Sequence, residues 1–349
     1  MSSTVVIDSD GDISLQLLQE QLGEEAEAPD EKTVDKKPET RELTVSSKVL
    51  SLASPVFKAM LSGRFKEGID LAEGIASTKP YTLNLPDDDA EATIILCKIL
   101  HFNINNVPEK PTPVCLEKLA FLCDKYQCIS AMKYCGSVWL RDWLLVYDSK
   151  VPSIDDLCRL LIFAYVIDLP HEFLGVSWRL FLYHKGPFVG PYTQAVILLD
   201  HPLLHQDVAG DLNTKRFECC QSFHRGIMAP MRWSWHTITG GCYRAAKAVG
   251  GYFNSLRIAI ILPYDLEFTE HKFCDLISKA SKLPSTHVSQ YSCSLRSCEC
   301  SNDPSNSLPG QLQYEVGLIN QRQKTFICLD CLKSNGSSKD EGKCRTSHS

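Results

Sequence analysis

The sequence predicts an α+β fold, in which a small sheet covered by helices occupies residues 1–145 and a mainly α-helical region with a cysteine-rich tail follows. Short segments of alternating apolar and polar residues come first, and this alternation is typical of half-buried strands. Segments with apolar residues three and four positions apart follow, as expected of helices that pack on a core. Near residue 283 the composition changes to Ser, Asn, Cys and Pro, which marks the start of the tail.

The overall composition indicates a globular protein with room for two domains. The 349 residues are 44% hydrophobic and 22% charged. The net charge of -6 and the absence of a long Lys/Arg run argue against a nucleic-acid partner. The N-terminus lacks a basic segment followed by an apolar one, and the apolar run at residues 258–262 is far too short to cross a bilayer. We therefore expect a cytoplasmic or nuclear protein that does not associate with membranes.

The first predicted elements are two short strands. Residues 5–7 and 13–17 alternate apolar and polar side chains on either side of Asp10 and Gly11. An Asp-Gly pair in this setting favours a hairpin turn, so we expect the two strands to pair with each other. Residues 19–40 then carry eight acidic and three basic side chains. Because such a segment buries little apolar surface, we expect a flexible acidic insertion, with a charged binding segment as the alternative.

A strand and two short helices are expected next. Residues 41–45 resume an extended pattern, and the serines that follow can cap a helix ending near residue 52. Ser54 and Pro55 are residue types preferred at the N-cap and first position of a helix, which we expect to end near residue 62. Because proline cannot continue the preceding helix, the sequence predicts two helices rather than one.

A further strand and three helices complete this domain. Tyr81–Leu85 alternates in polarity, and the proline and aspartates at residues 86–89 stop this strand and start a helix. That helix has an apolar face that runs through Leu100. Two more helices are expected over residues 114–126 and 129–145, where apolar residues recur at helical spacing.

A short signature connects these elements to a known family. Residues 43–61 combine a strand, a short helix and a helix start that reads Ser54-Pro55-Val56-Phe57. This segment resembles the signature of the BTB/POZ family, in the form found in fungi. Further matches follow in the family's order at residues 10–15, 65–68, 85–89 and 119–128. The sequence departs from the family at the acidic insertion, where the family has a tight connection.

The resemblance to the BTB/POZ family implies a surface that binds other proteins, including a second copy of the chain or a cullin scaffold. Phe65 and Glu67 match the hydrophobic-x-Glu element that family members use to contact cullins, and an exposed Phe65 would fill a pocket on the partner. The alternative is that Phe65 packs inside its own domain while Glu67 is solvated. Asp12 matches a position that some members use in a charged pocket, and the alternative is an aspartate that stabilises its local turn.

The region 150–282 is expected to be mainly helical. Apolar spacing predicts helices over residues 153–165, 172–184, 192–199 and 244–261. The region shows no propeller or ankyrin repeats and no zinc fingers of the two-Cys two-His type. The substrate-reading domain that normally accompanies a ubiquitin-ligase adaptor is therefore not visible in the sequence.

The sixteen cysteines fall into two groups. Disulfides are not expected in a reducing compartment, so the cysteines scattered through helical sequence are expected to be small core residues. These scattered cysteines are Cys97, Cys115, Cys123, Cys128, Cys135, Cys158, Cys219, Cys220 and Cys242. Cys274 and Cys344 have no evident partner.

The remaining cysteines lie in the tail, residues 283–349. A Cys-x-x-Cys pair can place two thiolates on one tetrahedral zinc ion, and a histidine or cysteine from the start of the tail can complete the site. The candidate ligands of this structural zinc are His287, Cys293, Cys298, Cys300, Cys328 and Cys331. The alternative is a partly disordered tail with reduced cysteines and no metal. A redox Cys-x-x-Cys is disfavoured because no strand-helix context of the thioredoxin type surrounds it.

The sequence contains no signature of a catalytic site. A glycine-rich phosphate loop, a nucleophile elbow and a paired-histidine metalloprotease helix are all missing. We therefore expect a non-enzymatic protein-interaction module. A substrate adaptor of a cullin ubiquitin ligase is the first alternative. A transcriptional regulator that uses the cysteine tail on nucleic acid is the second, and the near-neutral charge of the tail disfavours it.

Overall fold

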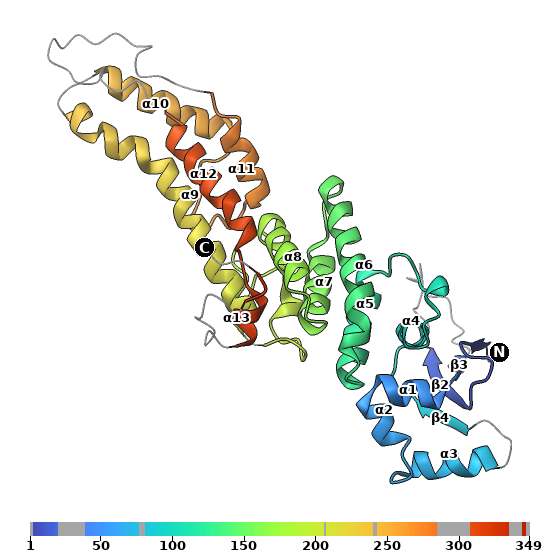
Figure 1. Ribbon diagram of the computed structural model, residues 1–349. Coiled ribbons are helices and arrows are strands. Elements are labelled where there is room, and N and C mark those ends of the chain that lie inside the picture. The colour runs from blue at the N-terminus through green and yellow to red at the C-terminus, as the bar shows by residue number, and fades with distance from the viewer. Residues whose placement is uncertain are drawn as a thin grey trace, which may run out of the picture. The chain divides into compact units, whose positions relative to one another are not determined.

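The structure of the chain is a computed structural model (Figure 1). It describes residues 3–19, 39–76, 81–205, 207–239, 243–284, 308–334 and 344–346. One small sheet is combined with a majority of helix, so the predicted mixture of a sheet and many helices is confirmed. The chain divides into two compact units. The first contains Met1–Ser149 and Arg159–Glu172, and the second contains Lys150–Cys158 and Phe173–Ser349.

The first unit contains a four-stranded mixed sheet. Its strands are β1 (Ser3–Val6), β2 (Ile13–Gln19), β3 (Glu39–Val45) and β4 (Tyr81–Leu85), in the spatial order β1-β3-β2-β4. Strand β3 pairs antiparallel with β2 and parallel with β1, while β2 pairs parallel with β4. β2 and β3 reach into both ends of the predicted acidic insertion, and residues 20–38 lie outside the described residues.

The predicted hairpin between the first two strands is wrong. β3 lies between β1 and β2, so these two strands do not pair. The turn itself exists, because the N–H of Gly11 donates to the carbonyl of Asp8 at 3.1 Å. However, a Cβ at Gly11 would lie 2.8 Å from the carbonyl oxygen of Val45, the last residue of β3. The connection therefore crosses closely over the end of β3 instead of joining adjacent strands, and only glycine fits there.

Helices pack on this sheet and on one another (Figure 1). They include α1 (Ser47–Ala53), α2 (Pro55–Met60), α4 (Ala90–Leu100), α5 (Pro113–Lys125) and α6 (Ile129–Ser149). Helix α4 packs against β2 and β3 and also contacts α1, α5 and α6. Most of its side chains are buried, as its apolar sequence predicts. The predicted positions of all five helices are confirmed to within a few residues.

Local capping explains where the short helices begin. The side chain of Ser54 accepts the N–H of Phe57 at 3.0 Å, and Pro55 occupies the first helical position, as predicted. The Ser54 hydroxyl also donates to the carbonyl of Tyr126 at 2.6 Å. In turn, the Tyr126 hydroxyl donates to Asp88, a buried carboxylate that also pairs with Lys125 at 2.6 Å. These bonds fix the helix pair against the C-terminal end of α5.

The sequence did not predict α3 (Lys66–Ala76). Two glycines lower the intrinsic helix propensity of this segment. Gly68 is buried, and a Cβ there would lie 1.9 Å from the carbonyl oxygen of Ser62. The glycine therefore lets α3 turn back closely on the residues that follow α2. Helix α3 packs against β4 at the edge of the sheet (Figure 1).

Two helices connect the units along the chain. These are α7 (Ile154–Val166) and α8 (Pro170–Tyr183), and both were predicted. Each contributes residues to both units. The predicted helix over residues 192–199 is wrong, because this segment contains only a 3-10 turn at Val196–Leu198. No helix among the described residues combines the length and the apolar character that crossing a membrane requires.

The second unit is a bundle of helices (Figure 1). It contains α9 (Asp207–Thr239), α10 (Tyr243–Ile258), α11 (Phe273–Ser281), α12 (Gly310–Gln321) and α13 (Leu329–Lys333). The predicted helix over 244–261 corresponds to α10. Helix α12 packs against α9 and α11, and α10 packs against α9. The part of the predicted cysteine-rich tail that carries α12 is therefore packed into the same bundle as α9.

The scattered cysteines are mostly core residues, as predicted. Those with buried side chains are Cys97, Cys115, Cys123, Cys128, Cys158, Cys219 and Cys220. Cys135 is half-buried, and Cys242 lies outside the described residues. Burial raises the pKa of the Cys97 thiol to about 12, which keeps it protonated and unreactive at neutral pH.

Alanine substitution at two helical glycines is expected to change stability in opposite directions. At Gly226 in α9, a Cβ would lie 2.8 Å from the Cα of Leu312, so Gly226→Ala forces α9 and α12 apart and destabilises the second unit by about 1–3 kcal/mol. Gly250 in α10 has no atom within 4 Å of the added Cβ. Gly250→Ala therefore stabilises the unit by about 0.5–1 kcal/mol through helix propensity. Urea denaturation of both variants measures these changes in the free energy of unfolding. Equal changes in the two variants would contradict the close approach of α9 and α12.

Candidate functional site

An exposed apolar face lies at the start of α3. Phe65 directly precedes this helix and is 53% exposed, so the alternative in which it packs inside its own domain is not what the structure shows. Ile69 is 47% exposed, and its N–H donates to the carbonyl of Phe65 at 3.1 Å. Residues four apart on a helix share a face, so Phe65 and Ile69 form one apolar patch. We call these two residues the α3 patch.

Two acidic side chains of α3 lie close to the sheet. Glu67 lies in the first turn of α3, where the helix dipole favours a negative charge, and its side chain is half-buried. The pKa of Tyr81, at the start of β4, is raised by burial and also by the charges of Asp70 and Glu67. The shift indicates that these two carboxylates lie near β4. They therefore lie toward the sheet, on a different face of the helix from Phe65 and Ile69.

Asp12 has a structural role in this conformation. Its Oδ1 accepts the N–H of Ser47 at 2.7 Å, and its Oδ2 accepts the hydroxyl of Ser47 at 2.6 Å. Next to it, the N–H of Ser46 donates to Nε2 of His101 at 3.0 Å, while Nδ1 of His101 bonds to the carbonyl of Cys97. Asp12 and His101 thus both satisfy backbone groups at the start of α1. Asp12 does not stabilise its own turn, and its two oxygens are engaged by Ser47.

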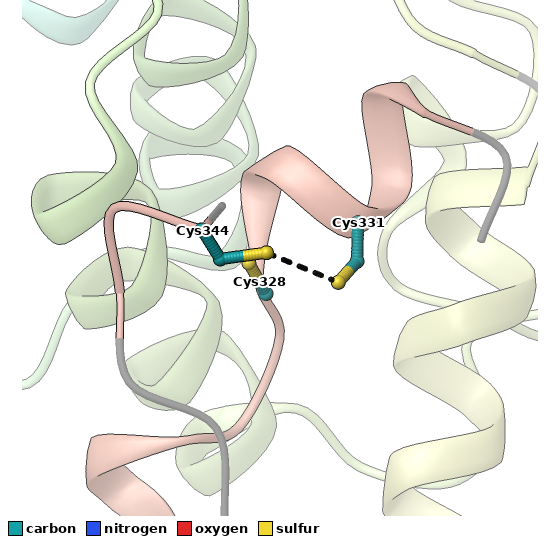
Figure 2. Close-up of side chains that lie close together, drawn as sticks. All are labelled: Cys328, Cys331 and Cys344. Atoms are coloured by element: carbon teal, nitrogen blue, oxygen red, sulfur yellow. Dashed lines mark hydrogen bonds between the residues drawn. The ribbon is translucent and has the colours of Figure 1, made fainter. Parts of the chain in front are cut away.

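A cluster of three cysteines in the second unit could hold a metal ion. The sulfur atoms of Cys328, Cys331 and Cys344 all lie within 4.8 Å of one another (Figure 2). The sulfurs of Cys331 and Cys344 are 3.6 Å apart. Cys328 precedes α13, Cys331 lies within this helix, and Cys344 comes from the segment after it. We call these residues the three-cysteine cluster.

The surroundings of Cys328 favour a thiolate. Partial burial alone would raise the pKa of this thiol, but hydrogen bonds from several donors lower it below its ordinary value. The Thr346 hydroxyl donates to its sulfur at 3.2 Å, and the backbone N–H groups of Cys331 and Asp330 and the thiol of Cys344 add to the effect. By contrast, burial raises the pKa of Cys274 to about 11. Because the thiolate is the form that binds metals, Cys328 is prepared for this role.

An ion pair lies beside the three-cysteine cluster. Asp330 accepts Nε of Arg345 at 3.0 Å and also its Nη2, and it accepts the N–H of Arg345 at 2.7 Å. Asp330 follows Cys328 by two residues and Arg345 follows Cys344 by one. The ion pair therefore joins the same two segments as the cysteines.

Only part of the predicted metal site can be placed. The structure brings the predicted ligands Cys328 and Cys331 together, whereas His287, Cys293, Cys298 and Cys300 lie outside the described residues. The expectation that Cys344 has no partner is wrong, because its sulfur lies 3.6 Å from that of Cys331. Its sequence signal was weak, because it is a lone cysteine 13 residues after Cys331.

Comparisons with known proteins add no family to this picture. No protein-family model, no curated protein and no solved structure gives a significant match to this chain. The two candidate sites, the α3 patch and the three-cysteine cluster, therefore rest on the geometry of their own residues.

Proposed function

We propose that the first unit is a BTB-like protein-interaction module without catalytic activity. Its order of elements supports this proposal: strands, the capped helix pair that starts at Ser54 and Pro55, a further strand, and the late helices α5 and α6. The single observation that carries the proposal is the exposure of the α3 patch, while the apolar faces of the sheet and of α4 are buried.

The α3 patch has the physical properties of a binding anchor. Moving the exposed half of a phenylalanine side chain from water into a partner pocket contributes on the order of 1–2 kcal/mol. Ile69 enlarges the apolar area that a partner would cover. A partner with an apolar pocket that can accept Phe65 and Ile69 fits this surface best. A second copy of the chain and a cullin scaffold are the two partner classes that the resemblance suggests.

The exposed position of Phe65 favours the cullin adaptor as the specific second candidate. The hydrophobic-x-Glu element requires a hydrophobic side chain that a partner can reach, and Phe65 is accessible, with Glu67 two residues further on in the first turn of α3. A complex with a cullin that forms at the α3 patch would identify this function. A complex formed only between copies of the chain would identify a dimerisation module.

Phe65→Ala is expected to weaken partner binding about 30-fold, which corresponds to about 2 kcal/mol. Two measurements on the full chain check this: sedimentation equilibrium for self-association, and affinity purification with identification of bound proteins. Phe102→Ala is the matched control, because Phe102 is 86% exposed but follows α4 rather than bordering α3. Equal binding by wild type and Phe65→Ala would overturn the proposed surface.

We also propose that the metal ion of the three-cysteine cluster is zinc in a structural role. Thiolates are soft ligands that favour zinc over calcium or magnesium, which prefer oxygen. Two of the cysteines have the Cys-x-x-Cys spacing that suits a tetrahedral zinc ion. Because structural zinc ions are almost always held by four protein ligands, we expect one further protein donor beside the three thiolates.

A further inference from the structure

We infer that the three-cysteine cluster is a metal latch that fastens residues 344–346 to α13, with Cys344 as an obligatory ligand. This inference rests on the zinc proposed above. Cys328 and Cys331 come from the start of α13, whereas Cys344 is 13 residues further along the chain than Cys331 (Figure 2). An ion bound by all three sulfurs would therefore close a loop between two segments, whereas an ion bound by Cys328 and Cys331 alone would connect only neighbouring turns.

The contacts around the cluster show that residues 344–346 are already positioned for this role. Thr346 is buried and its hydroxyl donates to the sulfur of Cys328, so the chain after Cys344 returns to the same cysteine pair. Arg345 is bound to Asp330 through both its backbone N–H and its side chain. All three residues of the short segment therefore contact α13 or the residue before it.

The metal is needed because the other contacts are weak. The side chain of Arg345 is 44% exposed, and exposed ion pairs contribute little to stability because solvent screens them. Closing a loop of this length costs entropy that such a pair does not offset. Metal–thiolate bonds are much stronger, since many small zinc-binding domains fold only when the metal is bound. Zinc binding by three cysteines is therefore the contact that holds the segment in place.

The first test measures which cysteines bind the metal. We expect about one zinc ion per purified full-length chain, and we expect titration with cobalt(II) to give thiolate-to-cobalt charge-transfer absorption. Cys344→Ser should lose most of the bound metal and most of this absorption. Cys274→Ser is the matched control, because Cys274 lies in α11 outside the cluster and should leave both unchanged.

The second test measures the latch itself, by hydrogen exchange of α13 and of residues 344–346 in the full chain. Removal of zinc from the wild type by a chelator should speed exchange there about tenfold or more, and added zinc should reverse it. This arm needs no substitution, so it holds even if Cys344→Ser fails to fold. Asp330→Asn should have a smaller effect on exchange and retain the metal.

The outcomes separate the latch from the zinc proposal. A wild-type chain without zinc and without cobalt absorption would overturn both. Zinc that is bound equally well by Cys344→Ser would overturn the latch and leave a zinc site at Cys328 and Cys331. Zinc that depends on Cys344 but whose removal leaves exchange unchanged would also overturn the latch, because the metal would then hold nothing in place.

Discussion

Replacing Arg216 with alanine is expected to destabilise the second unit by about 4 kcal/mol. The Arg216 side chain in α9 is fully buried, and its guanidinium lies 5.1 Å above the ring of Phe273. Nη1 donates to the carbonyl of His184 at 3.2 Å, and Nη2 donates to the carbonyl of Phe268 at 3.2 Å and lies near that of His271. The substitution leaves these carbonyls buried without their donor and also opens a cavity.

Urea denaturation of the full chain, with hydrogen exchange of α9 as the reporter, measures this loss. Arg257→Ala is the matched control, because Arg257 is exposed near the end of α10 and should change stability by less than about 0.5 kcal/mol. Arg216→Lys should remain strongly destabilised, since a single ammonium cannot reach carbonyls on several segments as the planar guanidinium does. A loss at Arg216→Ala no larger than that of the control would show that these carbonyls find other donors.

Arg216 also contributes to the protonation state of its neighbour His184. Burial, together with the positive charge of Arg216, lowers the pKa of His184 to about 4. His184 is therefore neutral at neutral pH, with Nδ1 bonded to the carbonyl of Gly186 and Nε2 bonded to the hydroxyl of Thr193. The buried charge of Arg216 thus binds several backbone carbonyls and also helps to keep His184 neutral.

The elements of the first unit that the sequence predicted well are those with local signals. Ser54 and Pro55 mark the start of α2 because capping depends only on residues within one turn. The strand Tyr81–Leu85 was predicted with its observed bounds, since alternation and the following proline are both local. The pairing of β1 was not predictable in this way, because the strand that separates it from β2 follows a long insertion.

The second unit was harder to predict because its longest helix, α9, contains residues that are unfavourable in a helix or on an apolar face. α9 contains Pro230 in its interior and many polar residues, so its sequence lacks the continuous apolar stripe of a typical helix. Its stability depends on packing against α10, the next helix, and against α12, which is distant in sequence. Propensity within a short window does not report such contacts.

In the candidate sites, too, the residues with a local sequence signal were predicted and those brought together by the fold were not. Phe65 was singled out by a short motif, but only the fold shows that Ile69 lies beside it on α3 and that the side chain of Phe65 is exposed. The pair Cys328 and Cys331 was evident from its spacing, whereas Cys344 joins them only through the path of the chain after α13. The spacing of residues in the sequence does not show that a loop brings Cys344 close to Cys328 and Cys331.

Phe57→Ala is expected to destabilise the first unit by about 3–5 kcal/mol. Phe57 in α2 is fully buried and its ring stacks on that of Tyr126, with ring centroids 4.2 Å apart. Tyr126 in turn accepts the hydroxyl of Ser54 and donates to the buried carboxylate of Asp88. Loss of the Phe57 ring therefore removes apolar contacts. It also removes the ring that packs against Tyr126, the residue that makes these hydrogen bonds.

Hydrogen exchange of α4 in the full chain reports the stability of the first unit, since most side chains of α4 are buried there. Leu52→Ala is the matched control in the same signature segment, because Leu52 is 80% exposed and should change stability by less than about 0.5 kcal/mol. If the two variants lost stability equally, the ring of Phe57 would not be a core contact. The signature segment would then no longer support a packed helix pair, and the proposal of a BTB-like module would lose its structural basis.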